Sequence, residues 1–336
     1  MLRNTLFLGI SAIAFPLSAA AVCGDGTIDP STEVCDDGNL IAGDGCDDVC
    51  VTESGWECTD AEFNLDFSED YNSDMVHGSG GPSWTLSPSG RQVSQSVNSS
   101  PGVYVSTLPA TGVTATFTLQ VNSASDDDFI GWAVGFNAGD FANPNSHWIL
   151  FDWKKSDQTM GSVCTAYAGL AMHRVQGTWT PSDAWCKDNA ASTITRANSL
   201  GYTGWNDFQV YTIDMIYNTN NVQIYVDGVL EFDENGFFPP GTFAFYSYSQ
   251  EGGIFTLTSP TEGSSVCAEL DDDQDGLSNN TEDSLGTDSN SSDSDGDSLG
   301  DFEEVWTHGT DPADADSDGD GLNDYEEVIT HGTDAN

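Results

Sequence analysis

The 336-residue chain contains 55 acidic residues but only 7 Lys and Arg, which gives a formal net charge of −48. Such a chain has no positive surface that could displace counterions from a phosphate backbone, so nucleic-acid binding is excluded. The same charge favours a partner that is itself a cation. Aromatic residues make up 11% of the chain and include nine Trp, which excludes a disordered chain and provides for a large core.

The first residues predict export from the cell. An early Arg3, an apolar stretch at 6–17 and small residues ending at Ala21 form the pattern of a secretory signal peptide over residues 1–21. The alternative is a lipid anchor on Cys23, for which Val22 is a poor preceding residue. The apolar stretch is too short to span a bilayer, and no other segment predicts a membrane span. We therefore expect a secreted protein, either extracellular or at the cell surface.

Eight cysteines in an exported chain are expected to form disulfides. Five lie early and three late, namely Cys23, Cys35, Cys46, Cys50 and Cys58, then Cys164, Cys186 and Cys267. Both groups are odd, so at least one bridge joins them. We expect Cys58–Cys267, which flank the middle of the chain, and Cys164–Cys186 within it. The other four allow three pairings, between which the sequence does not decide, and metal ligation is a weak alternative because no His lies near them.

Residues 22–59 form a cysteine-rich module that is too short for a hydrophobic core, so its bridges must hold it together. Its Gly-Asp-Gly and Asp-Asp-Gly-Asn runs are typical of turns. A second interpretation is a calcium site made by Asp36, Asp37, Asn39 and Asp44. The pattern "CGDG…E.CDDGN…GDGC…C…GW.C" resembles a short cysteine-rich repeat of secreted bacterial proteins. That resemblance implies an extracellular setting and no particular activity.

Residues 60–267 are predicted to be mainly β. In "VTATFTLQV", strict alternation places one set of residues on a single face, namely Val113, Ala115, Phe117, Leu119 and Val121. Similar runs follow at 129–136, 147–154, 167–175, 208–217, 222–232, 242–249 and 254–258. About eight strands without helices predict an antiparallel two-sheet sandwich of the jelly-roll type.

The same segment resembles the C-terminal lectin-like domain of thrombospondins. The resemblance is carried by "DDDFIGWAVGF", "WILFDWK", "GLAMHRV", "YTGWNDFQVYTIDMIY", "VQIYVDG" and "GTFAFYSYSQEGGIF", which follow in the family's order. It implies a curved two-sheet sandwich with calcium at one end. It also implies that Asp126, Asp127 and Asp128 bind calcium, and the alternative is an acidic loop kept soluble by its charge.

The tail, residues 268–336, has 23 Asp or Glu and no Lys or Arg. Without a cation, such a segment is expected to repel itself and remain extended. Its spacing instead matches a twelve-residue calcium loop three times, with side-chain oxygens at positions 1, 3, 5, 9 and 12 and a carbonyl at position 7. The predicted ligands are Asp271, Asp273, Asp275, Leu277, Asn279 and Glu282; Asp293, Asp295, Asp297, Leu299, Asp301 and Glu304; and Asp316, Asp318, Asp320, Leu322, Asp324 and Glu327.

The three loops begin 22 and 23 residues apart, which leaves room for one short helical turn and no entering helix. Phe302, Val305 and Trp306 are expected to be the few buried contacts of that turn. The second loop has Ser298 where the other two have Gly at position 6, so we expect it to be strained or weaker. A dockerin-like module is a less favoured alternative, because its helices are longer and more apolar.

"GTDPADADSDGDGLNDYEEV" resembles the thrombospondin type 3 calcium repeat. The resemblance implies a chain wrapped around a row of ions, so that folding and calcium binding are one event. In thrombospondins these repeats precede the lectin-like domain, whereas here they follow it. The Arg-Gly-Asp tripeptide of that family is absent, so no integrin-type partner is implied. The repeat pattern breaks off at "THGTDAN", where the chain either ends or continues in a longer array.

The favoured hypothesis is a secreted, calcium-binding adhesion or matrix protein that is not an enzyme. Its sandwich would recognise a glycan or a surface protein, and its tail would form a calcium-stiffened stalk. One alternative is a secreted glycan-active hydrolase using Glu231 and Asp233, which strand alternation places on one face. A third is a structural spacer without a ligand. We expect the five His at the surface, and Trp84, Trp148, Trp153, Trp179 and Trp185 either in the core or stacked on sugar rings.

Overall fold

The computed structural model describes residues 23, 33–35, 46–59, 72–75, 81–111, 113–160, 164–259 and 266–336. The predicted signal peptide lies outside these residues. So do His77 and the four candidate ligands of the cysteine-rich module, Asp36, Asp37, Asn39 and Asp44.

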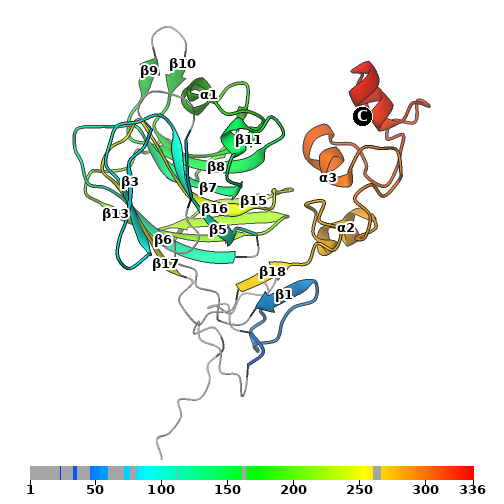
Figure 1. Cartoon of the computed structure of the whole chain (residues 1–336), viewed down its shortest axis with the longest axis horizontal. Helices are drawn as coiled ribbons and strands as arrows, with labels where there is room; N and C mark the ends of the chain where they lie inside the picture. The colour runs from blue at the N-terminus through cyan, green and yellow to red at the C-terminus, as the bar shows by residue number, and fades with distance from the viewer. Residues whose placement is uncertain are drawn as a thin grey trace, which may run out of the picture.

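Two antiparallel sheets, each seven-stranded, pack face to face in the middle of the chain (Figure 1). The first sheet has the order β12 (Ala191–Arg196), β11 (Gly169–Gln176), β8 (His147–Lys154), β7 (Phe129–Phe136), β16 (Thr242–Tyr248), β5 (Gly102–Pro109) and β2 (Asn72–Met75). The second has the order β15 (Val229–Asn235), β14 (Asn221–Val226), β13 (Val210–Tyr217), β6 (Val113–Val121), β17 (Gly253–Ser259), β4 (Gln92–Gln95) and β3 (Trp84–Leu86). The predicted mainly β, two-sheet sandwich is confirmed.

Alternation along the strands divides the apolar residues between two clusters. Phe151 and Trp153 of β8 face the second sheet, where Phe151 stacks on Trp132 with ring centroids 4.9 Å apart. Trp148 points to the outer face of the first sheet, against Trp179. The five Trp considered for sugar stacking are therefore packing residues: four are buried, and Trp84 is half-buried against the inner core.

The outer face of the first sheet is partly covered by short elements. These are the 3-10 helix η1 (Asp140–Ala142), the hairpin of β9 (Gln158–Met160) and β10 (Cys164–Ala166), and α1 (Pro181–Cys186). Thr180 and Asp183 form a capping box at the start of α1. The expected Cys164–Cys186 disulfide is present and ties β10 to the end of α1.

The N-terminal module is held by the bridges Cys23–Cys50 and Cys35–Cys46. It is joined to the rest of the chain where β1 (Trp56–Thr59) pairs with β18 (Val266–Glu269). In this pairing Cys58 lies directly opposite Cys267, the position that the expected bridge requires, and Cys58 is disulfide-bonded. No cysteine is free among the described residues.

Each tail loop leads into one short helical segment, and in the described tail no helix runs directly into a loop, as predicted. These segments are α2 (Asn279–Leu285), α3 (Asp301–Glu303) continuing as the π-helix η2 (Glu304–His308), and the π-helix η3 (Glu326–His331). Each ends at a glycine with positive φ, at Gly286, Gly309 and Gly332. No helix in the described part of the chain is long and apolar enough to cross a membrane.

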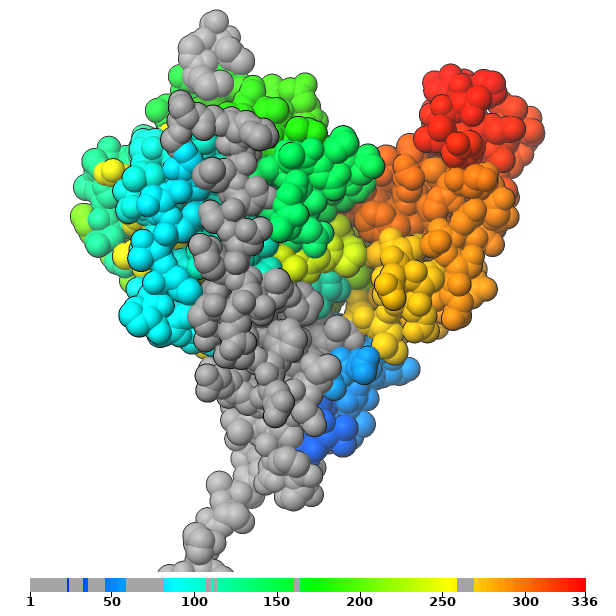
Figure 2. Space-filling model, viewed as in Figure 1, coloured from blue at the N-terminus to red at the C-terminus, as the bar shows by residue number. Residues whose placement is uncertain are grey.

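The first two loops pack against the sandwich. Trp306 is buried and belongs to the inner core, and the guanidinium carbon of Arg174 in β11 lies 4.2 Å from its ring centroid. The rings of Phe302 and Trp306 both contact His147. The third loop bonds to the second, since Tyr325 N–H donates to Asp297 Oδ2 at 2.8 Å, and its red end stands clear of the sandwich in Figure 2. Phe302 and Trp306 thus do more than bury one turn, because they fasten the tail to the sandwich.

Replacing Trp306 by Ala is expected to lower the free energy of unfolding by about 3 kcal/mol, because a buried aromatic side chain leaves a cavity in the core. Val305, its half-buried neighbour, provides the control, since Val305→Ala should cost about 1 kcal/mol or less. Urea unfolding followed by circular dichroism in saturating calcium measures both. Equal losses in the two variants would show that Trp306 does not anchor the tail.

Candidate metal centres

The first tail loop gathers three carboxylates. One oxygen each of Asp271, Asp273 and Asp275 lies within 4.8 Å of the others. Backbone amides hold them in place: Asp273 Oδ1 accepts from Asp275 N–H at 3.1 Å, and Asp275 Oδ1 accepts from Leu277 N–H at 2.7 Å. Asp271 accepts from Gln274 N–H at 2.7 Å and Gly276 N–H at 3.2 Å. The loop backbone therefore uses one oxygen of Asp273 and of Asp275 and leaves the other.

The remaining oxygens are buried without partners. Asp273 Oδ2, Asp275 Oδ2 and both carboxylate oxygens of Glu282 accept no hydrogen bond from the described residues. Glu282 is fully buried and enters from the first turn of α2. Buried polar atoms without partners are costly, and oxygen atoms alone, including two from one glutamate, are the donor set that calcium prefers. The residues present therefore fit a calcium ion.

The other two loops repeat this arrangement. The carboxylates at positions 1, 3 and 5 again meet within 4.8 Å, as Asp293, Asp295 and Asp297, and as Asp316, Asp318 and Asp320. Asp295 Oδ2, Glu304 Oε2 and Glu327 Oε2 are buried without partners among the described residues. The hydrogen-bond pattern also repeats, with position 3 accepting from position 5 and position 5 from position 7. The Leu277, Leu299 and Leu322 carbonyls remain predicted ligands.

The residues at position 9 form hydrogen bonds within the loops that the sequence did not predict. Asn279 Oδ1 accepts from Asp272 N–H, and both oxygens of Asp301 accept from Ser294. Asp324 accepts from Ser317 in the same way. In all three loops this side chain ties the start of the helix to position 2 of the loop. Its part in holding an ion, directly or through water, remains a prediction.

Burial and mutual repulsion raise the pKa values of these acids. Burial, followed by the charges of Asp273 and Asp275, raises the pKa of Glu282 to about 8. Burial, with Asp295 and Asp297, raises the pKa of Glu304 to about 8. The pKa values of Asp275 and Asp295 rise to about 6, first through burial. Asp301 of the second loop contributes to the raised pKa of Glu282, so neighbouring loops interact electrostatically.

Ser298 occupies the strained position that the sequence indicates. Its φ is +88°, close to the +107° and +100° of Gly276 and Gly321 at the same position of the other loops. A side chain in this region is disfavoured by about 1–2 kcal/mol, whereas glycine is not.

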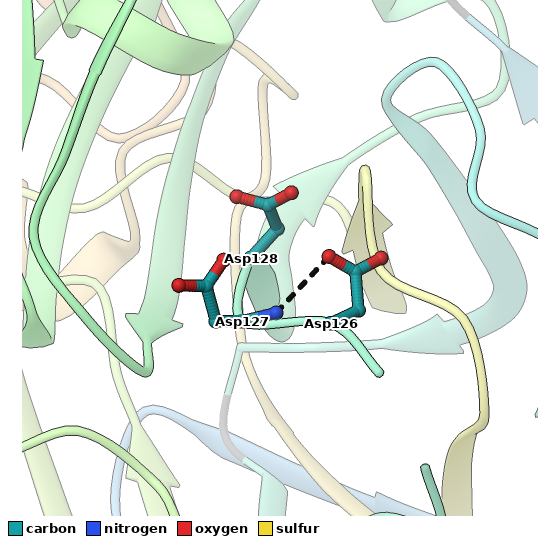
Figure 3. Close-up of side chains that lie close together, drawn as sticks. All are labelled: Asp126, Asp127 and Asp128. Atoms are coloured by element: carbon teal, nitrogen blue, oxygen red, sulfur yellow. Dashed lines mark hydrogen bonds between the residues drawn. The ribbon is translucent and has the colours of Figure 1, made fainter. Parts of the chain in front are cut away.

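Asp126, Asp127 and Asp128 lie side by side at the start of β7, as Figure 3 shows, with one oxygen each within 4.8 Å of the others. Their surroundings differ from those of the tail loops. Asp128 is buried and forms an ion pair with Lys154 Nζ at 2.6 Å. Asp127 accepts from the Ser156 hydroxyl, and Asp126 accepts from Asn98 Nδ2 at 2.7 Å. An ammonium already balances Asp128, so this is a less suitable calcium site than the loops, and its role as a metal site remains a prediction.

The carboxylate pair suggested for a hydrolase is not formed. The β14–β15 register shifts between Ile224 and Tyr225, which leaves Glu231 as an extra residue in β15. Alternation therefore fails there. Glu231 is buried and accepts from Ser199 N–H and Leu200 N–H, whereas Asp233 is exposed. Glu231 therefore holds the loop at Ser199 and Leu200 in place, and the two carboxylates do not form a pair that could act on one glycosidic bond.

A buried polar cluster on the outer face of the first sheet was not predicted from the sequence. Asp152 Oδ1 lies 2.9 Å from His173 Nε2, and Asp152 Oδ2 lies 2.6 Å from Lys187 Nζ. Burial alone would raise the pKa of Asp152, but Lys187 and His173 lower it to about 2. The surface position expected for His173 is wrong. The sequence does contain one sign of this cluster: two polar residues, Asp152 and Lys154, stand two positions apart in an otherwise apolar strand.

Comparison with known proteins agrees with this architecture. The thrombospondin C-terminal region family matches residues 79–255, more than half of the chain, so the chain belongs to this family. The bacterial TSP3 repeat family matches residues 271–292 and 316–336, and a family described as a domain of unknown function matches residues 20–51. The second loop, with Ser298, lies between the two matched repeat segments.

The curated relatives include thrombospondin-1 of Xenopus laevis, 26% identical over 140 residues, which covers 39% of this chain and 11% of the relative. Cartilage oligomeric matrix protein of Homo sapiens is 26% identical over 133 residues, which covers 38% of this chain and 15% of the relative. The chain thus matches less than a fifth of either relative. Among solved structures, a carbohydrate-binding module of Bacillus subtilis aligns with a TM-score of 0.36 and 11% identity, covering 60% of this chain and 97% of that one.

Replacing Ser298 by Gly is expected to tighten calcium binding at the second loop roughly fivefold, because it removes about 1 kcal/mol of backbone strain. Ser292→Gly, at an exposed position without positive φ, is the matched control and should leave the affinity unchanged. Calorimetric titration of the full chain with calcium compares the two. If both variants bind calcium with the affinity of the parent chain, the positive φ of Ser298 does not limit calcium affinity at the second loop.

Calcium uptake is expected to release protons at pH 7 and to weaken as the pH falls from 8 to 6. With pKa values of about 8, Glu282 and Glu304 are largely protonated at pH 7 without the ion, whereas calcium binds the carboxylate form. Between the ordinary value of 4.5 and 8, the ion-free fold binds more protons than the unfolded chain, so its stability falls as pH rises. Calorimetry in two buffers of different ionisation enthalpy measures the protons released. No release, with equal affinity at pH 6 and 8, would contradict these pKa shifts.

Proposed function

We propose that this chain is a secreted, calcium-binding adhesion or extracellular-matrix-type protein. The observation that carries the proposal recurs in three successive loops: buried carboxylate oxygens that have no hydrogen-bond partner among the described residues. A cation at each loop would supply the missing partner for these atoms. Membership of the thrombospondin C-terminal region family supports the assignment of calcium.

The ligand supply of the first loop meets the needs of calcium, which takes six to eight oxygens. Asp271, Asp273 and Asp275 offer one oxygen each, Glu282 offers two, and the Leu277 carbonyl and Asn279 are further candidates. The second and third loops offer corresponding sets ending in Glu304 and Glu327. On this proposal residues 268–336 bind three calcium ions.

The tail then has two parts. Its first two loops would hold the Trp306 side chain in its place against the sandwich, since Trp306 follows Glu304 by two residues. The third loop, which stands clear of the sandwich, would begin the calcium-stiffened stalk (Figure 2). Residues 22–59, 60–267 and 268–336 would serve as the disulfide-rich module, the recognition domain and the calcium repeats.

The sandwich would act in recognition of a glycan or a surface protein rather than in catalysis. Glu231, the candidate catalytic acid, is committed to the backbone of Ser199 and Leu200. A pocket on the outer face of the first sheet, lined by aromatic, hydroxyl and basic side chains, is the candidate binding site.

The full chain is expected to take up three tail calcium ions with affinities on the order of 10⁻⁶ to 10⁻³ M. Glu282→Gln, Glu304→Gln and Glu327→Gln should each remove or weaken one of them by at least tenfold, because each removes a charge from a bidentate ligand. Asp283→Asn is the control, since Asp283 is exposed and lies outside the ligand set. Calorimetry gives the number of ions. If the chain takes up no calcium at about 10 mM, the proposal fails.

A further inference from the structure

A hollow on the outer face of the first sheet is the most distinctive site outside the tail. It has a volume of about 670 Å³, within the range of small-molecule sites. Its floor comes from Asp152 of β8 and His173 of β11, and its wall from Thr193 of β12. The Cys164–Cys186 bridge holds β10 and the end of α1 together beside it. One disulfide and three adjacent strands therefore build a preformed cavity.

Two basic side chains of this acidic chain line the hollow. Lys187 and Arg196, two of its seven Lys and Arg, line the hollow together with His173. Lys187 is neutralised by Asp152 at 2.6 Å, and burial lowers the pKa of His173, so that its ring is neutral at pH 7. Among the described residues, no carboxylate forms an ion pair with Arg196. Arg196 is therefore the uncompensated cation of the hollow.

Arg196 is held in place and retains free donors. Its Nη1 donates to the carbonyls of Ala168 and Gly201, while Nε and Nη2 have no acceptor among the described residues. The guanidinium carbon lies 4.8 Å from the ring centroid of Tyr202, whose side chain is 80% exposed. A guanidinium with free N–H groups is suited to bind carboxylate or sulfate. An exposed aromatic ring beside it offers an apolar surface for stacking.

A hydrogen-bond relay sets the polarity of Thr193. Because His173 is neutral, Nε2–H donates to Asp152, and Nδ1 accepts from the Thr193 hydroxyl at 3.0 Å. The Thr193 proton is thus directed inward, and its oxygen is left as an acceptor at the exposed side. A ligand hydroxyl is the complementary donor. The hollow therefore offers an anion donor set, a hydroxyl acceptor and an aromatic face together.

We propose that this hollow binds an acidic sugar, a ring bearing a carboxylate or a sulfate. Arg196 would bind the anionic group, Thr193 would accept a ring hydroxyl, and Tyr202 would stack on the apolar face of the ring. The net charge of −48 opposes anions at long range, but exposed charges are screened beyond roughly 10 Å at 0.1 M salt, so local groups decide. The proposal rests on the recognition role given above to the sandwich and names the class of its ligand.

Calorimetry on the full chain with saturating calcium tests it with four probes: sialyllactose for a carboxylate, a heparin tetrasaccharide for sulfate, neutral lactose, and inorganic sulfate. At least one acidic sugar should bind at least tenfold more tightly than lactose or sulfate. Arg196→Gln and Thr193→Val should each weaken that binding about tenfold or more. Tyr202→Ala should weaken it several-fold, and its exposure makes it safe for folding. Lys155→Gln, which removes a positive charge outside the hollow, should have no effect.

The probe that binds distinguishes carboxylate from sulfate as the source of the anion. If lactose binds as tightly as the acidic sugars, or if inorganic sulfate binds as tightly as the heparin tetrasaccharide, the proposal that the ligand is an acidic sugar is wrong. Acidic-sugar binding unchanged by Arg196→Gln, Thr193→Val and Tyr202→Ala would place the site elsewhere. If no sugar binds while calcium uptake is intact, the hollow is not a sugar site, and the calcium proposal is unaffected.

Discussion

Electrostatic repulsion among carboxylates that the loop backbone forces together is the constraint on which the C-terminal part of the molecule depends. The loop N–H groups fix one oxygen of Asp273 and of Asp275, and the other oxygen of each is buried without a partner among the described residues, as are both oxygens of Glu282. The pKa values near 8 for Glu282 and Glu304 express the cost of this arrangement without a cation. Calcium at these positions would turn the repulsion into mutual attraction to an ion, so binding and ordering become one event.

This local requirement extends to the architecture. Phe302 and Trp306 lie on the helical turn that follows the second loop, and they reach the sandwich through His147 and Arg174. Gly276 of the first loop packs between Phe302 and Pro240 of the sandwich. An ion that orders these loops would therefore also order the contact between tail and sandwich. In thrombospondins the repeats come before the lectin-like domain, yet the reversed order here still brings the two parts into contact.

Local patterns predicted much of this structure. The alternation at Phe117 and Leu119 predicted a half-buried strand, and the acidic spacing predicted three loops without entering helices. Features that depend on distant partners were missed. The bulge at Glu231 interrupts the alternation of buried and exposed residues in β15, and the sequence alone does not reveal a bulge. Lys154 contacts Asp128 only because β7 pairs with β8. The hollow combines residues from three adjacent strands and a disulfide, and no short motif contains its chemistry.

Amide hydrogen exchange of the full chain, with calcium and with a chelator, tests most directly whether ions organise the tail. If they do, the amides of Gly276, Leu277, Leu299 and Leu322, which donate to loop carboxylates, should be protected only with calcium. The strand amides of Phe117 and Trp132 should remain protected in both conditions. Equal protection of the tail amides with and without calcium would contradict the central claim that calcium binding and ordering of the tail are one event.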